Sequence, residues 1–154
     1  MIIVGFPGIG KSTLSRGIGG KYLDLESSMF AVNKKKIDNW EIPYTRVAEY
    51  LSRKGFDVFV SSDEDVTRAL EHSSEIVVMC VPSINLRDEW IARLKKRARD
   101  SQLTKDKNAV RHVSINYKKD IENLHALAEE YQFPIIVLQS MDYDLKKELE
   151  DFSF

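Results

Sequence analysis

The segment from Gly5 to Ser12 has the residue types and the spacing needed to bind a chain of phosphate groups. It reads GFPGIGKS and fits the pattern G-x-x-x-x-G-K-[S/T] at every fixed position. Glycines let the backbone curl so that successive N–H groups face one point, and the helix that follows adds its positive dipole end. Lys11 would bring a cation to the outer phosphates, and the Ser12 hydroxyl is a natural ligand for Mg²⁺. We expect a nucleoside triphosphate to be bound by Gly5, Pro7, Gly8, Ile9, Gly10, Lys11, Ser12 and Thr13.

Carboxylates follow two later apolar runs of the chain. Asp24 and Glu26 end the first of these runs, and residues two apart on a strand point to the same side, so both can face one cleft. The alternative is a pair of solvated acids at a strand end. Asp63 ends the next run, where it could hold a Mg²⁺-bound water or, equally well, cap the helix after it.

Basic and aromatic side chains form two further groups. Arg93 and Arg97 lie four residues apart and would share one flank of a helix, from which both can reach one anion. The alternative is a solvated basic face. Trp40, within a segment rich in lysine, could stack on a nucleotide base, or it could simply anchor that segment as a small hydrophobic contact.

These residues need a framework that brings them to one place. Five short apolar runs rich in β-branched residues predict strands buried on both faces, as in a parallel sheet, at residues 1–5, 21–25, 57–61, 75–81 and 134–138. Helical patterns lie between them, at residues 11–18, 43–54, 64–72, 85–99, 114–131 and 142–152. This alternation predicts one α/β domain over residues 1–154, built from βαβ units.

Two details of this framework can be tested against the structure. Val47, Tyr50 and Leu51 are predicted to lie on one face of the second helix, and Leu86, Trp90, Leu94 and Ala98 form the apolar stripe that packs the fourth helix down. Residues 27–43 and 101–111 are polar and are predicted to be irregular.

Composition narrows the classes of protein further. The chain has 154 residues, 43% of them hydrophobic, which excludes a disordered protein. Its net charge of −1 argues against a dedicated nucleic-acid coat or a polybasic membrane anchor. No apolar run approaches the ~20 residues that span a bilayer, and the one cysteine, Cys80, permits no internal disulfide. We expect a cytoplasmic protein with no membrane partner and no zinc site.

The loop at residues 5–12, the acidic strand end at residues 24–26 and the short chain resemble the small P-loop kinases. These are the nucleoside monophosphate kinases and their shikimate- and gluconate-kinase relatives, and short phage-borne members are among the similar proteins. The resemblance implies a three-layer αβα sandwich whose five-stranded parallel sheet has the order 2-3-1-4-5. It also implies ATP and Mg²⁺ as cofactors, an acceptor-binding insert near residues 27–46 and a lid near residues 83–112.

The resemblance also implies roles for single residues. Asp24 would lie near Mg²⁺ and Glu26 near the acceptor, but relatives have Asp where this chain has Glu26, which leaves the acceptor geometry open. Arg68 would grip an acceptor phosphate. The expected catalytic residues are Lys11, Asp24, Glu26, Arg93 and Arg97; the acceptor-binding residues are Asp24, Glu26, Trp40 and Arg68; the metal-binding residues are Ser12, Asp24 and Asp63.

Three functions fit these residues. The first is an ATP- and Mg²⁺-dependent phosphotransferase that acts on a (deoxy)nucleoside monophosphate. The second is a kinase of a hydroxyl group on a small metabolite or on DNA, at a 5′ end or a modified base, because two carboxylates could take a hydroxyl proton. The third is a P-loop ATPase or nucleotide-binding module without a small acceptor. ADP release in the presence of different acceptors distinguishes the three, and the sequence leaves the oligomeric state open.

Overall fold

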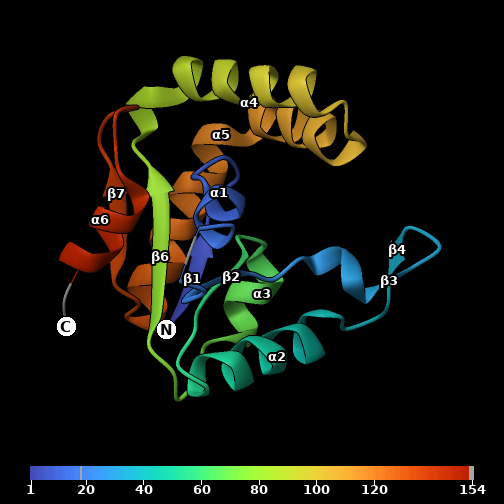
Figure 1. Ribbon diagram of the computed structural model, residues 1–154, viewed down its shortest axis with the longest axis vertical. Coiled ribbons are helices and arrows are strands. Elements are labelled where there is room, and N and C mark those ends of the chain that lie inside the picture. The colour runs from blue at the N-terminus through green and yellow to red at the C-terminus, as the bar shows by residue number, and fades with distance from the viewer. Residues whose placement is uncertain (18, 153–154) are drawn as a thin grey trace.

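Five strands form one parallel sheet in the computed structural model, which describes residues 1–17 and 19–152. The strands, in chain order, are β1 (Ile2–Gly5), β2 (Tyr22–Asp24), β5 (Asp57–Ser61), β6 (Val77–Pro82) and β7 (Ile135–Leu138). They lie side by side in the order β2-β5-β1-β6-β7 (Figure 1). Every pairing in this sheet is parallel, so the carboxyl ends of the strands meet at one edge.

A small hairpin that was not predicted supplies the two remaining strands. β3 (Ala31–Val32) and β4 (Lys35–Lys36) pair antiparallel outside the main sheet. Asn33 and Lys34 between them both have positive φ, as a two-residue hairpin turn requires. The predicted order 2-3-1-4-5 was numbered without this hairpin. Because β3 and β4 come between β2 and the next strand of the main sheet, the observed order β2-β5-β1-β6-β7 differs from it in the numbers of the last three strands along the chain.

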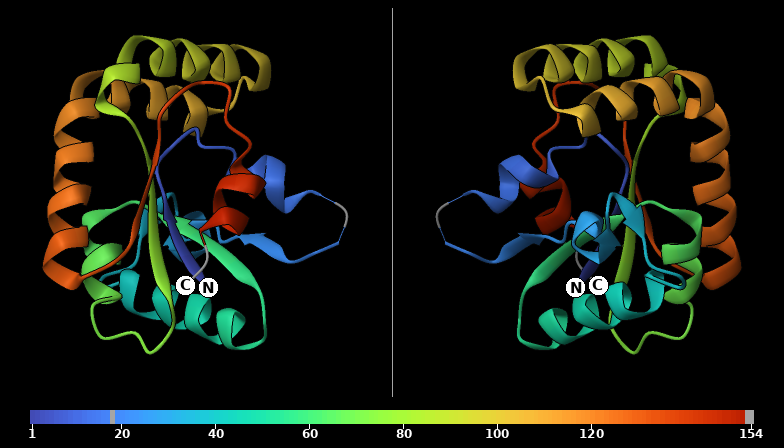
Figure 2. Two further views of the ribbon diagram at one scale, coloured as in Figure 1. Left: turned by 90° about the vertical axis from the view of Figure 1, so that its left-hand side faces the viewer. Right: turned by 90° about the vertical axis from the view of Figure 1, so that its right-hand side faces the viewer.

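Helices cover both faces of the sheet and its carboxyl edge. They are α1 (Lys11–Ser15), α2 (Glu41–Arg53), α3 (Glu64–Ala69), α4 (Arg87–Ser101), α5 (Thr104–Tyr131) and α6 (Leu145–Asp151), with 3-10 turns at Ser27–Phe30 and Ile84–Leu86. α2, α3 and α5 lie on one face, and α1 and α6 lie on the other (Figure 2). α4 lies across the carboxyl edge and packs on the first part of α5 (Figure 1). The predicted helix end at Ile18 lies outside the described residues.

The buried strands explain why the apolar runs of the sequence could be recognised. Every residue of β1 and β6 is buried, because helices cover these central strands on both sides. Three members of the predicted stripe of α4 are confirmed, since Trp90, Leu94 and Ala98 are all buried, whereas Leu86 lies in the 3-10 turn before α4 and is half-buried. No helix in the described part of the chain combines the length and the apolar character needed to cross a membrane.

The prediction for α2 was wrong about its buried face. Val47 and Tyr50 are exposed, and Leu51 is partly buried against the core. The fully buried residues of this helix are Tyr44, Thr45, Ala48 and Ser52. The reason is the Tyr44 hydroxyl, which is bound to the backbone of two strand ends and so fixes the rotation of the helix. Small residues on the same face then let the helix approach the sheet closely.

The prediction for residues 101–111 was also wrong, because most of them are helical. Gln102, with φ of 57°, ends α4, and α5 begins at Thr104 and continues for 28 residues. The buried positions Asp106, Val113, Tyr117 and Ile121 form one stripe at helical spacing. A charged residue at the first of these positions hid the start of the stripe from a search for apolar residues.

Candidate functional site

The loop between β1 and α1 is held in shape from its outer side. The carbonyl oxygen of Pro7 accepts a hydrogen bond from Nε1 of Trp90 at 2.8 Å, and that of Ile9 accepts one from the Tyr143 hydroxyl at 2.8 Å. In residues 1–17 and 19–152, no side chain caps the start of α1 at Gly10. The loop therefore turns carbonyl groups toward the surrounding protein, and the first N–H groups of α1 keep no side-chain acceptor.

Gly8 is required by the close approach of α4 to this loop. Its φ is +89°, a conformation that other residues rarely adopt. A Cβ atom there would lie 2.9 Å from Cδ2 of Leu94 and 3.1 Å from Nε1 of Trp90. The two α4 side chains thus occupy the space that a larger residue would need, and they set the curvature of the loop.

The Lys11 ammonium group lies inside the curve of the loop. It donates a hydrogen bond to the carbonyl oxygen of Gly5 at 2.6 Å. Burial lowers the pKa of this amine, the Asp24 carboxylate opposes that shift, and the nearby Arg97 guanidinium adds to it. A phosphate bound in the loop would favour the charged amine, because it would supply negative charge that the free protein gives only in part.

Two of the predicted metal-binding residues meet beside Lys11. The Ser12 hydroxyl donates a hydrogen bond to Oδ2 of Asp24 at 2.8 Å. Ser12 is in the first turn of α1, and Asp24 is the last residue of β2. A hydroxyl and a carboxylate, both oxygen donors, are the kind of ligand that Mg²⁺ prefers.

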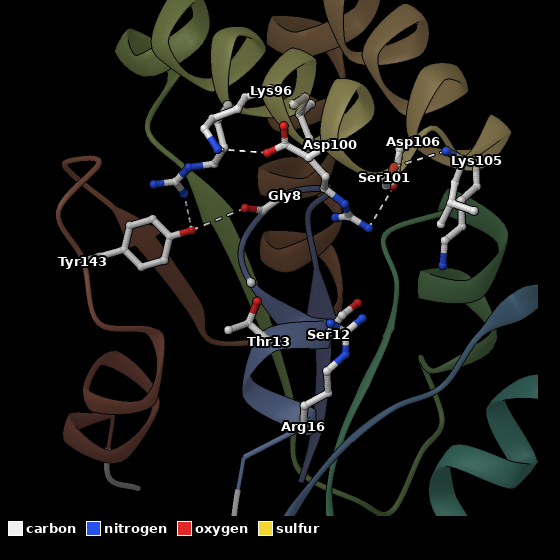
Figure 3. Close-up of a pocket in the computed structure, with 15 residues that line it drawn as sticks. Gly8, Ser12, Thr13, Arg16, Lys96, Asp100, Ser101, Lys105, Asp106 and Tyr143 are labelled. Carbon is white, nitrogen blue, oxygen red and sulfur yellow. Dashed lines mark hydrogen bonds and ion pairs between the residues drawn. The ribbon is translucent and has the colours of Figure 1, made fainter.

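Two cavities open on either side of the loop. The larger, here called the outer cavity, has a volume of about 670 Å³ and lies between α1, α4 and residue 143 (Figure 3). The smaller, here called the strand-end cavity, has a volume of about 190 Å³ and lies at the ends of β2 and β5. The residues that line both cavities are Gly8, Gly10, Ser12, Leu94, Arg97, Lys105 and Asp106. Of the predicted site residues, Thr13 and Arg93 line only the outer cavity. Those that line only the strand-end cavity are Pro7, Lys11, Asp24 and Glu26.

The structure directs Arg93 and Arg97 to different partners, although both belong to α4. Arg93 donates hydrogen bonds to the Tyr143 hydroxyl at 2.7 Å and to the carbonyl oxygen of Met141 at 2.9 Å. Its guanidinium also lies 4.9 Å from the ring centre of Trp90. Arg97 instead pairs with Asp106 at 2.9 Å, in the wall shared by the two cavities. The two guanidinium groups therefore have no shared partner among the described residues, and their joint binding of one anion stays a prediction.

Two site residues that sequence reasoning missed come from the first turn of α5. Nζ of Lys105 lies 3.1 Å from Oε1 of Glu26, and this ion pair joins α5 to the end of β2. Asp106 follows directly and holds Arg97. Both residues fall in the expected lid at residues 83–112, but residues 101–111 are predicted to be irregular, so no direction follows for either side chain. Their charge is the one feature by which the sequence could have marked Lys105 and Asp106 as site residues.

Tyr44 is a third residue that sequence reasoning left without a role. Its side chain is fully buried, donates to the carbonyl oxygen of Leu25 at 2.7 Å and accepts from the backbone N–H of Ser61 at 2.9 Å. Burial raises the pKa of its hydroxyl, so the group stays protonated and can donate. Tyr44 thus ties the end of β2 to the end of β5 in the wall of the strand-end cavity.

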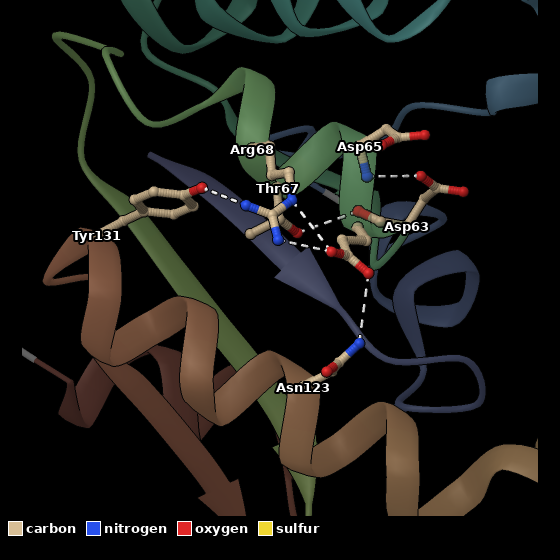
Figure 4. A network of polar contacts seen from close by, with 7 residues as sticks. Asp63, Asp65, Thr67, Arg68, Asn123 and Tyr131 are labelled. Atoms are coloured by element: carbon tan, nitrogen blue, oxygen red, sulfur yellow. Dashed lines mark hydrogen bonds and ion pairs between the residues drawn. The ribbon is translucent and has the colours of Figure 1, made fainter.

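Five of the predicted residues line neither cavity: Gly5 and Ile9, which belong to the loop, and Trp40, Asp63 and Arg68. Trp40 packs on Tyr44, with 5.3 Å between ring centres, and Nζ of Lys36 lies 3.6 Å from the centre of one of its rings. Arg68 donates to Glu64 and to the Tyr131 hydroxyl, away from the loop (Figure 4). These contacts favour an anchoring role for Trp40 and a surface ion pair for Arg68.

Asp63 is the cap of α3. Its carboxylate accepts a hydrogen bond from the backbone N–H of Asp65 at 2.9 Å, which is the N-cap arrangement weighed as the alternative to metal binding (Figure 4). Within the described residues, no group of three or more His, Cys, Asp or Glu side chains could hold a metal ion.

Comparison of the chain with models of known protein families and with curated proteins gives no match. Function is therefore inferred from the loop, the two cavities and the charged side chains between them.

Proposed function

We propose that this protein is an ATP- and Mg²⁺-dependent phosphotransferase of the P-loop kinase type. The observation that supports it best is the convergence of three groups on one loop. Lys11 lies inside the curve, the Ser12 hydroxyl is bound to Asp24, and Arg97 stands in the wall between the two cavities. Phosphoryl transfer needs positioning and positive charge more than covalent chemistry, and these groups supply both.

In this proposal the phosphates of ATP bind along the loop, and the nucleoside occupies the outer cavity. The free N–H groups at the start of α1 and the Lys11 ammonium would hold the phosphate oxygens. Ser12 and Asp24 fit a Mg²⁺ ion whose remaining ligands are phosphate oxygens and waters. The ion would neutralise charge on the phosphates as it builds up during transfer.

The acceptor would occupy the strand-end cavity. The terminal phosphorus of ATP then loses its bond to the bridging oxygen and gains a bond to an acceptor oxygen, which leaves ADP and a phosphorylated product. Arg97, reaching both cavities, is suited to contact the phosphoryl group between donor and acceptor. A nucleoside monophosphate is the first acceptor to test, with Lys105 as the cation available to its phosphate.

A hydroxyl acceptor is the second candidate, and one observation favours it. The strand-end cavity is lined by the carboxylates of Asp24, Glu26 and Asp106, and none of its lining residues comes from the lysine run at residues 34–36. A carboxylate near the acceptor oxygen can take its proton, whereas a phosphate acceptor needs no such base. The two candidates therefore differ in whether Glu26 is needed as a proton acceptor.

Release of ADP from Mg²⁺-ATP, measured with a panel of acceptors, tests the proposal. The panel consists of nucleoside monophosphates, nucleosides, small polyols and oligonucleotides, each with product mass determined. We expect one class to stimulate ADP release and to gain a phosphoryl group. Replacing Glu26 by Gln should change the acidic limb of the pH–rate profile for a hydroxyl acceptor and leave it unchanged for a phosphate acceptor. ADP release that no acceptor stimulates would contradict the kinase proposal and favour an ATPase.

A further inference from the structure

Asp106 is a buried carboxylate in the wall that the two cavities share. Only 5% of its side chain is exposed, and its Oδ1 lies 2.9 Å from Nη2 of Arg97. Its other oxygen accepts a hydrogen bond from the Ser101 hydroxyl, at the place where α4 gives way to α5 (Figure 3). A buried carboxylate is costly unless both of its oxygens have partners, and here each has one.

Arg97 depends on Asp106 for its direction. Its side chain is 45% exposed, and among the described residues Asp106 is its one hydrogen-bonding or ion-pairing partner. A guanidinium group has five N–H donors in a fixed plane. Contact with one carboxylate oxygen therefore fixes the group at one corner and leaves most of its donors for a ligand in the cavities.

We propose that Asp106, supported by Ser101, is a positioning residue that aims Arg97 at the phosphoryl group during transfer. This inference rests on the proposed function. A long arginine side chain without an anchor samples many rotamers, and a cation contributes most to a transition state when its position is set beforehand. Arg93 cannot take over this task, because its guanidinium is held by Tyr143 and Met141.

A merely structural role for Asp106 makes a different prediction. If the carboxylate only joined α4 to α5, its loss would lower stability and leave the rate of the folded protein unchanged. The two helices have other means of association, because Trp90 and Leu94 of α4 and Tyr117 of α5 are all buried in one hydrophobic core. The proposal therefore has to be tested by rate constants rather than by stability.

A double-mutant cycle in kcat provides that test. We expect Asp106→Asn to lower kcat by about 10–100-fold, as misplacement of one catalytic group does. The KM for ATP should stay within about threefold, because the lost interaction belongs to the transition state. In an Arg97→Ala background, Asp106→Asn should have no further effect on kcat. Independent, multiplying losses in the double variant would overturn the proposal.

Asp57→Asn is the matched control. Asp57 is another buried carboxylate, with 8% of its side chain exposed and a salt bridge to Lys21, and it lies at the opposite, amino end of β5. Its replacement should lower the melting temperature and leave kcat unchanged. If Asp106→Asn does not fold, Ser101→Ala replaces it in the cycle. Ser101→Ala should then lower kcat in the wild-type background but not with Arg97→Ala, and an equal effect in both backgrounds would overturn the proposal.

Failure of the proposed function can be told apart from failure of this inference. A wild-type protein without phosphoryl transfer to any acceptor contradicts the proposed function alone. The cycle is then measured in the Kd for Mg²⁺-ADP with aluminium fluoride, which mimics the phosphoryl group during transfer. Coupling between Asp106→Asn and Arg97→Ala supports the positioning of Arg97, and additive effects overturn it.

Discussion

The pKa of Lys11 offers a way to measure whether a triphosphate binds in the proposed place. Burial lowers the pKa of its amine in the free protein from the usual value of 10.5. Bound triphosphate would shift the pKa back upward, because nearby negative charge favours the ammonium form. Binding must then take up a proton wherever the free amine is neutral and the bound one is charged.

We predict that the affinity for Mg²⁺-ATP falls as the pH rises through the lowered pKa of Lys11. The fall should begin below the usual lysine value and can reach about tenfold per pH unit. In Lys11→Arg the guanidinium stays protonated over this range, so its affinity should be nearly independent of pH. Titration calorimetry from neutral to alkaline pH measures both proteins. Parallel pH dependences would show that Lys11 is not the group that titrates.

Single residues divide clearly into those that the sequence could assign and those that it could not. The pairing of Ser12 with Asp24 follows from a motif and a strand end that are close along the chain. Lys105 and Glu26 are 79 residues apart, and only the path of α5 across the carboxyl edge brings them together. Nothing in the local sequence of Lys105 distinguishes it from a solvated surface lysine.

The contact of α4 with the loop between β1 and α1 constrains the shape of that loop. We predict that Gly8→Ala destabilises the protein and weakens ATP binding. An alanine at position 8 would have to adopt the left-handed backbone conformation at φ of +89°, and its Cβ atom would also clash with Leu94. The clash should lower the free energy of unfolding by about 1–3 kcal/mol beyond the effect of the backbone strain, as overpacking of a buried site does.

Gly55→Ala is the control for this prediction. Gly55 has a similar φ of +93° but no atoms within 4 Å of the place where its Cβ would be. Its replacement should cost only the backbone strain, about 1 kcal/mol, and should leave ATP binding unchanged. Urea unfolding and ATP titration of both variants are the measurements. Equal losses of stability would mean that α4 does not constrain the loop.

Helices whose buried faces are apolar throughout could be predicted from the sequence. A helix whose buried face begins with a charged residue could not. The stripe of α4 was confirmed at Trp90, Leu94 and Ala98. The first turns of α5 were missed, because Asp106 occupies a buried position that an apolar residue would normally mark. The buried face of α2 was misjudged because the Tyr44 hydroxyl, and not apolar periodicity, fixes its rotation.

Binding at the loop should stabilise the molecule as a whole, since the loop joins β1, α1 and α4. We predict that a non-hydrolysable ATP analogue with Mg²⁺ raises the melting temperature. At a ligand concentration 100 times Kd, binding to the native state adds about 2.7 kcal/mol. For a domain of this size that corresponds to roughly 5–10 °C. Adenosine should have little effect, and Lys11→Ala should reduce the shift strongly. An equal shift with adenosine would contradict phosphate binding.

At the scale of the whole molecule, the sheet and its α/β layers follow from the alternation of apolar runs and helical patterns. Buried β-branched strands leave a strong signal because both of their faces are covered. The hairpin at residues 31–36 left almost none, since its strands have two residues each and lie outside the core. The strand-end cavity, the proposed acceptor site, is lined in part by Lys105 and Asp106 from the first turn of α5, another weakly marked segment. The acceptor therefore cannot be predicted from the sequence.

Phosphorus NMR of one reaction mixture tests the central claim most directly. The mixture contains the protein, Mg²⁺-ATP and the pooled acceptor classes, and the fate of the terminal phosphate is followed over time. If the protein is a P-loop kinase, this phosphate appears on an acceptor at the rate at which ADP forms. Lys11→Ala should slow the transfer by about 10³-fold or more. Recovery of the terminal phosphate only as inorganic phosphate, or transfer by Lys11→Ala at more than a tenth of the wild-type rate, would contradict the proposed kinase activity.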